Sequence, residues 1–215
     1  WRALSHAVDR EQVVAGAMFG FGTPIGSHFA PHHPAYVDMT GMYPHDPARA
    51  RALLAEAGVS GLELTITVPP TTYAQRSAEI IAAQLAEVGI LVELEAVEWA
   101  RWLESVYADA NYDLTIVSHV EPMDIGIYSD PGYYFRYDSD EFRDLIAAAN
   151  RAAVPEEQYR LLGEAQRMLA ADAVNVFLFE LPRVGAARAG LRGLWRNAPM
   201  FLNDMAVVRW ADANQ

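Results

Sequence analysis

The sequence predicts an α/β fold built on a β-α-β-α-β core whose strands run parallel. Three observations support this fold class. Segments 62–68 and 90–97 are strand-like, and the shorter segment 112–117 is apolar enough for another strand. The connecting segments, 72–88 and 98–109, carry apolar residues at helical spacing. Crossovers of this length join parallel strands through right-handed connections.

The chain opens with a segment, 1–19, that predicts a helix because apolar residues recur along one stripe. That stripe consists of Leu4, Val8, Val13 and Val14. Residues 20–47 have no regular period and are rich in Gly, Pro and His, so we expect a long loop there. Loops of this length in compact domains usually serve a function.

The segment after this loop predicts a helix with both ends marked. Asp46 is a suitable N-cap, Pro47 takes the first helical position and Gly58 ends the helix. In the strand at 62–68, apolar residues alternate strictly with Glu or Thr, which indicates one buried face. The helix predicted at 72–88 has Ile81, Leu85 and Val88 on its apolar side.

The second half of the chain predicts two more helices and a set of less regular segments. Phe142, Leu145, Ile146 and Ala149 line one helix, and Tyr159, Leu162 and Leu169 line the other. The apolar segment 174–180 predicts a strand, and short strands are expected in the tail near 183–188 and 205–210.

The composition excludes several classes of function. A net charge of −12 argues against nucleic acids and anionic membrane surfaces, which require clustered cations. The chain has no cysteine, which excludes disulfides, thiol catalysis and thiolate metal sites. All its cationic side chains other than histidine are arginines, so Schiff-base chemistry and a Walker-type phosphate lysine are excluded.

The loop after the strand at 112–117 is the strongest candidate for a functional site. Ligands of open parallel sheets bind at loops beyond the carboxyl ends of the strands. The candidate ligand-binding residues of this loop are Ser118, His119, Glu121, Asp124 and Tyr128. A carboxylate such as Glu121 can hold a cationic group through a charge-assisted hydrogen bond, and aromatic faces nearby attract the same charge. The sequence therefore favours capture of a cationic or zwitterionic solute.

Catalytic, metal-binding and cofactor-binding interpretations remain as alternatives. Glu121 and Asp124 could act as the catalytic acids of an α/β hydrolase-like enzyme. His28, His32 and His33 could bind a metal, but prolines interrupt any helix that would align them. The glycines of GFGTPIG follow a predicted helix rather than a strand, which disfavours a dinucleotide site. We therefore expect no enzyme activity, no cofactor and no metal.

Several segments together resemble one family. The opening RALSHAVDREQVVAGAMFGFGTP, the stretch HDPARARALLAEAG, the stretch AEIIAAQLAEVGILVELEAVEWARWLE and YDLTIV are similar, in order and spacing, to family 5 of the extracellular solute-binding proteins of ABC transporters. Members of that family handle peptides, opines and nickel. The resemblance covers about residues 1–180.

The resemblance implies a two-lobed periplasmic binding protein of class II type that closes on its ligand through a hinge. Residues 1–180 would form the C-terminal ligand-binding lobe, and residues 181–215 would return toward an N-terminal lobe that is not part of this chain. It also implies an extracytoplasmic location and delivery of a small molecule, such as a peptide or another amine-containing solute, to an ABC transporter membrane permease.

The resemblance also gives Glu121 a role. Peptide-binding members often carry G-W-x-A-D-Y after this strand, and the Asp holds the amino group of the peptide. In this sequence Ser118 stands at the Trp, Val120 at the Ala and Glu121 at the Asp. The carboxylate is kept and the aromatic residue is lost, so the resemblance does not extend to peptide specificity.

Overall fold

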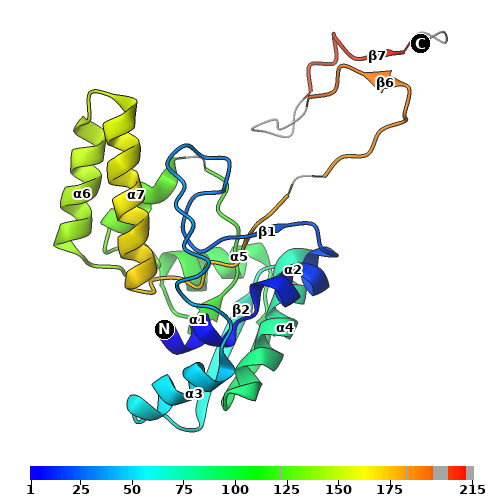
Figure 1. Ribbon diagram of the computed structural model, residues 1–215. Helices are drawn as coiled ribbons and strands as arrows, with labels where there is room; N and C mark the ends of the chain where they lie inside the picture. Colours follow the sequence, from blue (N-terminus) through cyan, green and yellow to red (C-terminus); the bar gives the residue numbers. More distant parts are fainter. Residues whose placement is uncertain (122, 183, 196–202, 212–215) are drawn as a thin grey trace. The chain divides into compact units, whose positions relative to one another are not determined.

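The computed structural model describes residues 1–121, 123–182, 184–195 and 203–211 (Figure 1). The chain divides into two compact units, Trp1–Pro182 and Arg183–Gln215. This division falls close to the boundary expected at residue 180. The roles assigned to the two parts, a ligand-binding lobe and a returning segment, stay predictions.

A parallel sheet lies at the centre of the first unit, and it confirms the predicted core. β2 (Leu62–Val68) lies between β3 (Ile90–Ala96) and β4 (Leu114–Thr115), and both neighbours run parallel to it. The register pairs Leu62 with Ile90 and Val68 with Ala96. The connection from β2 to β3 is α4 (Thr72–Glu87).

The sequence predicts a single helix between β3 and β4. The structure has two consecutive helices there. α5 (Trp99–Trp102) continues directly into the π-helix η1 (Leu103–Ala108). β4 is shorter than the predicted strand 112–117. Just before it, the Asp113 carboxylate accepts the backbone N–H of Thr65 of β2 at 2.9 Å.

The opening segment is not one helix, and that prediction is wrong. α1 (Arg2–Ala7) and α2 (Arg10–Met18) are separated by Val8, whose backbone is extended, and by Asp9. The Asp9 carboxylate accepts the backbone N–H of Gln12 at 3.1 Å and so caps α2. The N-cap lets the chain turn while Val8 stays buried in the core.

The helix predicted after the long loop is confirmed as α3 (Pro47–Glu56), capped by Asp46. Gly58 follows with a positive φ of 69°, a conformation that suits glycine at a helix end. The core of this part of the unit contains side chains from α1, α2, α3, α4, β2 and β3, among them Val13, Ile66 and Leu85.

The apolar segment 174–180 forms a strand only at its end, so the predicted seven-residue strand is wrong. β5 (Phe179–Glu180) pairs antiparallel with β1 (Thr23–Pro24), which lies in the long loop. The residues before it, such as Val176 and Phe177, pack their side chains against the two main hydrophobic cores instead. An apolar run indicates burial without fixing the backbone conformation.

A helical hairpin, α6 (Asp140–Arg151) and α7 (Pro155–Ala171), confirms the two predicted late helices. Its core includes Phe142 and Leu169 from the hairpin together with Phe29 from the long loop. The 3₁₀-helix η2 (Asp124–Ser129) contributes Ile125 and Tyr128 to the same core. The hairpin therefore packs against both of the loops that surround the candidate site.

Gln166 of α7 is completely buried and holds the long loop in place. Its amide nitrogen donates to the backbone carbonyl of Ala35, and its side-chain carbonyl accepts from Ser27 Oγ at 3.1 Å and from the backbone N–H of Phe29 at 3.3 Å. A buried amide with all its partners fixes a loop that has little regular backbone hydrogen bonding.

The second unit contains one antiparallel pair, β6 (Leu191–Arg192) with β7 (Arg209–Trp210). The strand predicted near 183–188 is wrong, since residues 184–188 form no strand; residue 183 lies outside the described residues. The strand predicted near 205–210 is confirmed only at its last two residues. In the part of the chain that the structure describes, no helix is long and apolar enough to span a membrane.

We predict that Gln166→Leu lowers the free energy of unfolding by about 2–4 kcal/mol, because each buried polar group left without a partner costs about 1–3 kcal/mol. Urea denaturation measures the change. Gln75→Leu on the exposed side of α4 is the matched control, and we expect it to stay within about 0.5 kcal/mol of wild type. Equal stabilities of the two variants would show that Gln166 does not anchor the loop.

Candidate functional site

The candidate site lies in the loop between β4 and α6, which leaves the carboxyl edge of the parallel sheet. Three hydrogen bonds fix the start of this loop on the scaffold. Thr115 Oγ1 donates to the backbone carbonyl of Thr67 at 2.7 Å and accepts from Trp102 Nε1 at 2.9 Å. The backbone N–H of Ser118 donates to the hydroxyl of Tyr73 on α4 at 2.9 Å.

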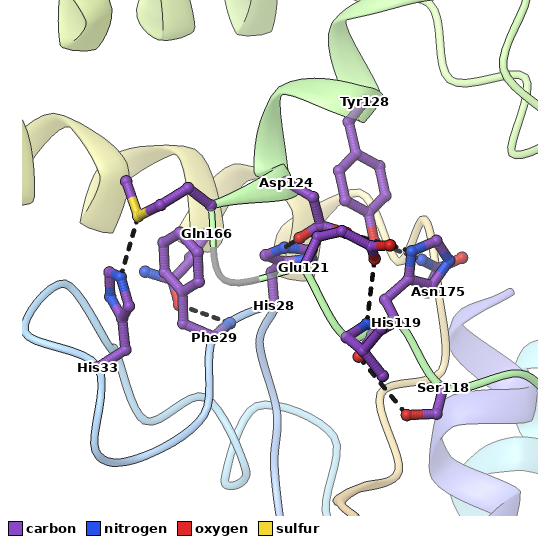
Figure 2. A network of polar contacts seen from close by, with 12 residues as sticks. His28, Phe29, His33, Ser118, His119, Glu121, Asp124, Tyr128, Gln166 and Asn175 are labelled. Carbon is purple, nitrogen blue, oxygen red and sulfur yellow. Dashed lines mark hydrogen bonds and ion pairs between the residues drawn. The ribbon is translucent and has the colours of Figure 1, made fainter. Parts of the chain in front are cut away.

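The centre of the site is the carboxylate of Asp124, which lies between two imidazoles (Figure 2). His28 Nε2 donates to one oxygen at 2.8 Å, and His119 Nδ1 donates to the other at 3.2 Å. The side chains of Asp124 and His28 are only 10% and 8% exposed, and that of His119 is 27% exposed. The second ring nitrogen of His119 lies 2.8 Å from the hydroxyl of Tyr134.

This environment keeps Asp124 ionised. Burial by itself would raise the pKa of the Asp124 carboxyl, but hydrogen bonds from His119 and His28 outweigh it and hold the pKa well below its usual range. Burial raises the pKa of the Tyr134 hydroxyl, so that group stays neutral. A neutral phenol can either donate to the His119 ring or accept from it.

Glu121 is exposed. Among the described residues, its carboxylate accepts a hydrogen bond from the backbone N–H of the neighbouring Val120 at 3.2 Å. Ligand atoms of His119, Glu121 and Asp124 all lie within 4.8 Å of one another. The structure therefore brings together these three predicted site residues.

Tyr128 and Ser118 have different surroundings. Tyr128 is buried, its hydroxyl accepts from Asn175 Nδ2 at 2.7 Å, and its ring stacks on Phe135 at 4.8 Å. The ring of His28 meets it edge to face at 5.5 Å. Tyr128 thus belongs to the hydrophobic core that carries the site. Its direct contact with a solute stays a prediction. Ser118 is half-buried at the start of the loop.

The three histidines considered as a metal set do not converge. His32 pairs with Glu180 at 2.9 Å, and the ring of His33 stacks on Phe29 at 4.0 Å. His33 Nε2 also lies 3.3 Å from the sulfur of Met123. His28 alone of the three reaches Asp124, a partner 96 positions away, so sequence spacing gave no signal of this pairing.

An aromatic face adjoins the cluster. Aromatic residues near this loop were expected, but the contribution of Tyr107 from η1 was not. Tyr107 of η1 is 47% exposed and meets the ring of Tyr133 at 5.6 Å, and Tyr133 lies 6.4 Å from the His119 ring. Burial, helped by the neighbouring Tyr107, Asp124 and Glu121, raises the pKa of Tyr133 to about 12. The signal in the sequence was the spacing of Trp99, Leu103 and Tyr107 on one helical stripe.

The geometry disfavours hydrolysis. Ser118 Oγ lies 3.5 Å from the backbone carbonyl of its neighbour His119, whose ring nitrogens are occupied by Asp124 and Tyr134. A serine nucleophile needs a base within hydrogen-bond reach. A general acid needs a raised pKa, whereas the pKa of Asp124 is lowered.

Comparisons with known proteins agree with a binding role. The profile of the bacterial extracellular solute-binding proteins, family 5 (middle region), matches residues 2–142. A glutathione-binding protein of Salmonella paratyphi A is 27% identical over 226 aligned positions, which cover 90% of this chain and 41% of that protein. The relatives reported are named as binding proteins, which gives the hydrolase alternative no support.

Solved structures share the fold. A periplasmic binding protein associated with an ABC transporter of Helicobacter pylori, in complex with the peptide STSA, superposes with a TM-score of 0.73 at 26% identity and covers 83% of this chain. A dipeptide-binding protein of a Pseudoalteromonas species, in complex with Met-Leu, gives a TM-score of 0.82 at 21% identity and covers 97%. The chain spans 37% and 44% of their lengths.

We predict that Asp124→Asn lowers the free energy of unfolding by about 1–3 kcal/mol, because the amide cannot accept hydrogen bonds from both imidazoles. Glu121→Gln, which removes a carboxylate three positions away in the same loop, should change it by less than about 0.5 kcal/mol because Glu121 is exposed. Parallel urea titrations of both variants measure the difference. If both variants matched wild type, the Asp124 cluster would not hold the loop.

Proposed function

The chain belongs to family 5 of the bacterial extracellular solute-binding proteins, and from this premise we propose that it is the C-terminal lobe of a two-lobed protein that captures a small amine-containing solute. The chain spans well under two thirds of its relatives, which supports the assignment to one lobe. Capture would occur at the loop between β4 and α6, with the second lobe closing over it.

The observation that carries this proposal is the exposed carboxylate of Glu121 beside an aromatic face. The acidic group of Glu121 has no arginine partner among the residues that the structure describes. A carboxylate without a cationic partner attracts a cationic group of a ligand, and the faces of Tyr133 and Tyr107 attract the same charge. An ammonium group therefore fits this position better than an anion.

The ligands of two relatives support the proposed class of solute, but they do not identify one compound. The Salmonella paratyphi A relative is named for glutathione, and the Helicobacter pylori protein is bound to the peptide STSA. Both ligands carry an ammonium group together with carboxylates. The chain lacks an aromatic residue at Ser118, so we propose a zwitterionic or cationic solute and do not restrict it to peptides.

The place of action and the partner follow from the same family. Family 5 proteins are extracellular or periplasmic. We infer that the protein acts outside the cytoplasmic membrane and hands its solute to the permease of an ABC transporter. Ligand capture of this kind requires no chemical step.

We predict that Glu121→Gln in the two-lobed protein weakens binding of its solute by about 1.5–3 kcal/mol, the usual value of a hydrogen bond to a charged group. Isothermal titration with glutathione and with the dipeptide Met-Leu, chosen from the ligands of relatives, supplies the measurement. N-acetylated Met-Leu is the ligand control, since it lacks the ammonium group and should bind wild type and variant equally.

Glu79→Gln, an exposed acid on α4, is the protein control and should bind like wild type. Unchanged affinity of Glu121→Gln for a solute that wild type binds would remove Glu121 from the site. Native mass spectrometry of the protein purified from its host gives an independent identification of the solute if neither probe binds.

A further prediction concerns the single lobe. We expect the 215-residue chain to fold but to bind the solute two to three orders of magnitude more weakly than the two-lobed protein, a loss of about 3–4 kcal/mol. Binding proteins gain much of their affinity by enclosing the ligand from both sides, and one wall leaves it in water. Titration of one ligand into both proteins decides the matter; equal dissociation constants would place the whole site within this chain.

A further inference from the structure

We propose that His119, Glu121 and Asp124 form a binding site for a first-row divalent metal ion of the Zn²⁺ type, with His28 orienting Asp124 from behind. This inference does not rest on the proposed function, because the four residues lie in this chain and metal binding is measured on the chain alone. The loop after β4 would supply the three ligands, and the long loop before α3 would support them through His28 (Figure 2).

The donor atoms have the spacing that a metal site needs. Metal–ligand bonds of about 2.0–2.2 Å place the ligand atoms of a tetrahedral site roughly 3.4 Å apart. The ligand atoms of His119, Glu121 and Asp124 all lie within 4.8 Å of one another, and His119 Nδ1 is 3.2 Å from one Asp124 oxygen. His28 Nε2 lies 2.8 Å from the other Asp124 oxygen and so orients the carboxylate.

The donor set also has the chemistry of such a site. One imidazole nitrogen and two carboxylate oxygens, with water in the remaining position, suit zinc and its first-row neighbours, whereas Mg²⁺ and Ca²⁺ prefer oxygen ligands alone. Asp124 and Glu121 contribute two negative charges in a loop where neither forms an ion pair with an arginine in the described parts of the chain. A divalent cation would neutralise both.

The surrounding side chains hold the imidazoles in position. Ligating histidines usually bond through their second ring nitrogen to another group, which fixes the tautomer. His119 Nε2 lies 2.8 Å from the neutral Tyr134 hydroxyl, so the ring can donate there while Nδ1 binds a metal. The ring of His28 is confined edge to face between Phe29 and Tyr128, at 5.1 and 5.5 Å.

The buried position of Asp124 and His28 distinguishes the proposed metal site from a chance grouping of surface side chains. The side chains of Asp124 and His28 are about nine-tenths buried, and His28 Nε2 lies 2.8 Å from Asp124 Oδ1. Groups held in this way lose little conformational freedom when a metal binds. Glu121 and the part-exposed His119 lie on the open side, so an ion can enter from solvent and a coordination position can remain for water or for a solute oxygen.

The experiment starts from the 215-residue chain treated with EDTA and then dialysed. We expect isothermal titration with ZnCl₂ to give one site per chain with a dissociation constant of about 1 µM or below. Titration with CoCl₂ should produce the visible absorption bands of a tetrahedral ion with nitrogen and oxygen ligands. MgCl₂ should not compete.

Variants decide which residues bind the ion. Glu121→Gln and His119→Asn should each weaken Zn²⁺ binding at least 10-fold, and Tyr134→Phe, which keeps the ring and removes the hydroxyl, should weaken it about 10-fold through the orientation of His119. His32→Gln and His45→Gln, histidines outside the cluster, should stay within two-fold of wild type. Circular dichroism establishes that each variant is folded.

Absence of a Zn²⁺ site in wild type overturns the proposal, and so does a site that survives both Glu121→Gln and His119→Asn. Loss of binding in His32→Gln or His45→Gln would assign the ion to surface histidines and overturn it equally. Solute titrations in EDTA test the proposed function separately: a solute that binds without metal leaves that function intact whatever ZnCl₂ shows.

Discussion

The Asp124 carboxylate between His28 and His119 is the contact on which the conformation of the candidate site depends. It joins two loops that have little regular backbone pairing, one before α3 and one after β4. A carboxylate that is 90% buried must be hydrogen-bonded to stay charged, and here two imidazoles supply those bonds. The same contact therefore stabilises the loops and fixes the positions of the polar groups at the sheet edge.

Other loop contacts are of the same kind. Buried side chains supply the hydrogen bonds that backbone pairing supplies in a regular strand or helix. Gln166 holds the long loop through Ala35, Ser27 and Phe29. The hydroxyl of Tyr112 donates to the backbone carbonyl of Tyr134 at 2.9 Å, and Asn175 donates to Tyr128. Regular helices and strands thus form the scaffold, and specific polar contacts set the shape of the loops that they carry.

Local patterns were sufficient to predict most of the scaffold. The strict alternation at 62–68, the cap at Asp46 and Pro47, and the apolar stripes of the late hairpin each specify an element without reference to distant residues. Parallel pairing followed from the lengths of the crossovers. These features depend on interactions within a few residues, which a single sequence displays directly.

The failures have distinct physical causes. Asp9 interrupts the opening helix although the apolar spacing continues through it, because a side-chain cap competes with the next helical hydrogen bond. The segment 174–178 is apolar except at Asn175 because its other side chains pack against the two main cores, and the pattern could not show that its backbone is irregular. The pairing of His28 with Asp124 spans 96 positions, so it belongs to the tertiary structure alone.

The charge of the site links capture of an amine with binding of a metal. Glu121 and Asp124 place two negative charges at the sheet edge, and the arginines that form ion pairs in the described chain, Arg49, Arg101, Arg143 and Arg160, pair with other acids. Either an ammonium group or a divalent ion lowers the cost of these charges. The two cations differ in what they require of His119. An ammonium group needs only acceptors and can leave the His28–Asp124–His119 contacts intact, whereas a metal ion takes a lone pair from the His119 ring and replaces its contact with Asp124 by coordinate bonds. The state of the His119 imidazole therefore distinguishes the occupants, while the carboxylates serve both.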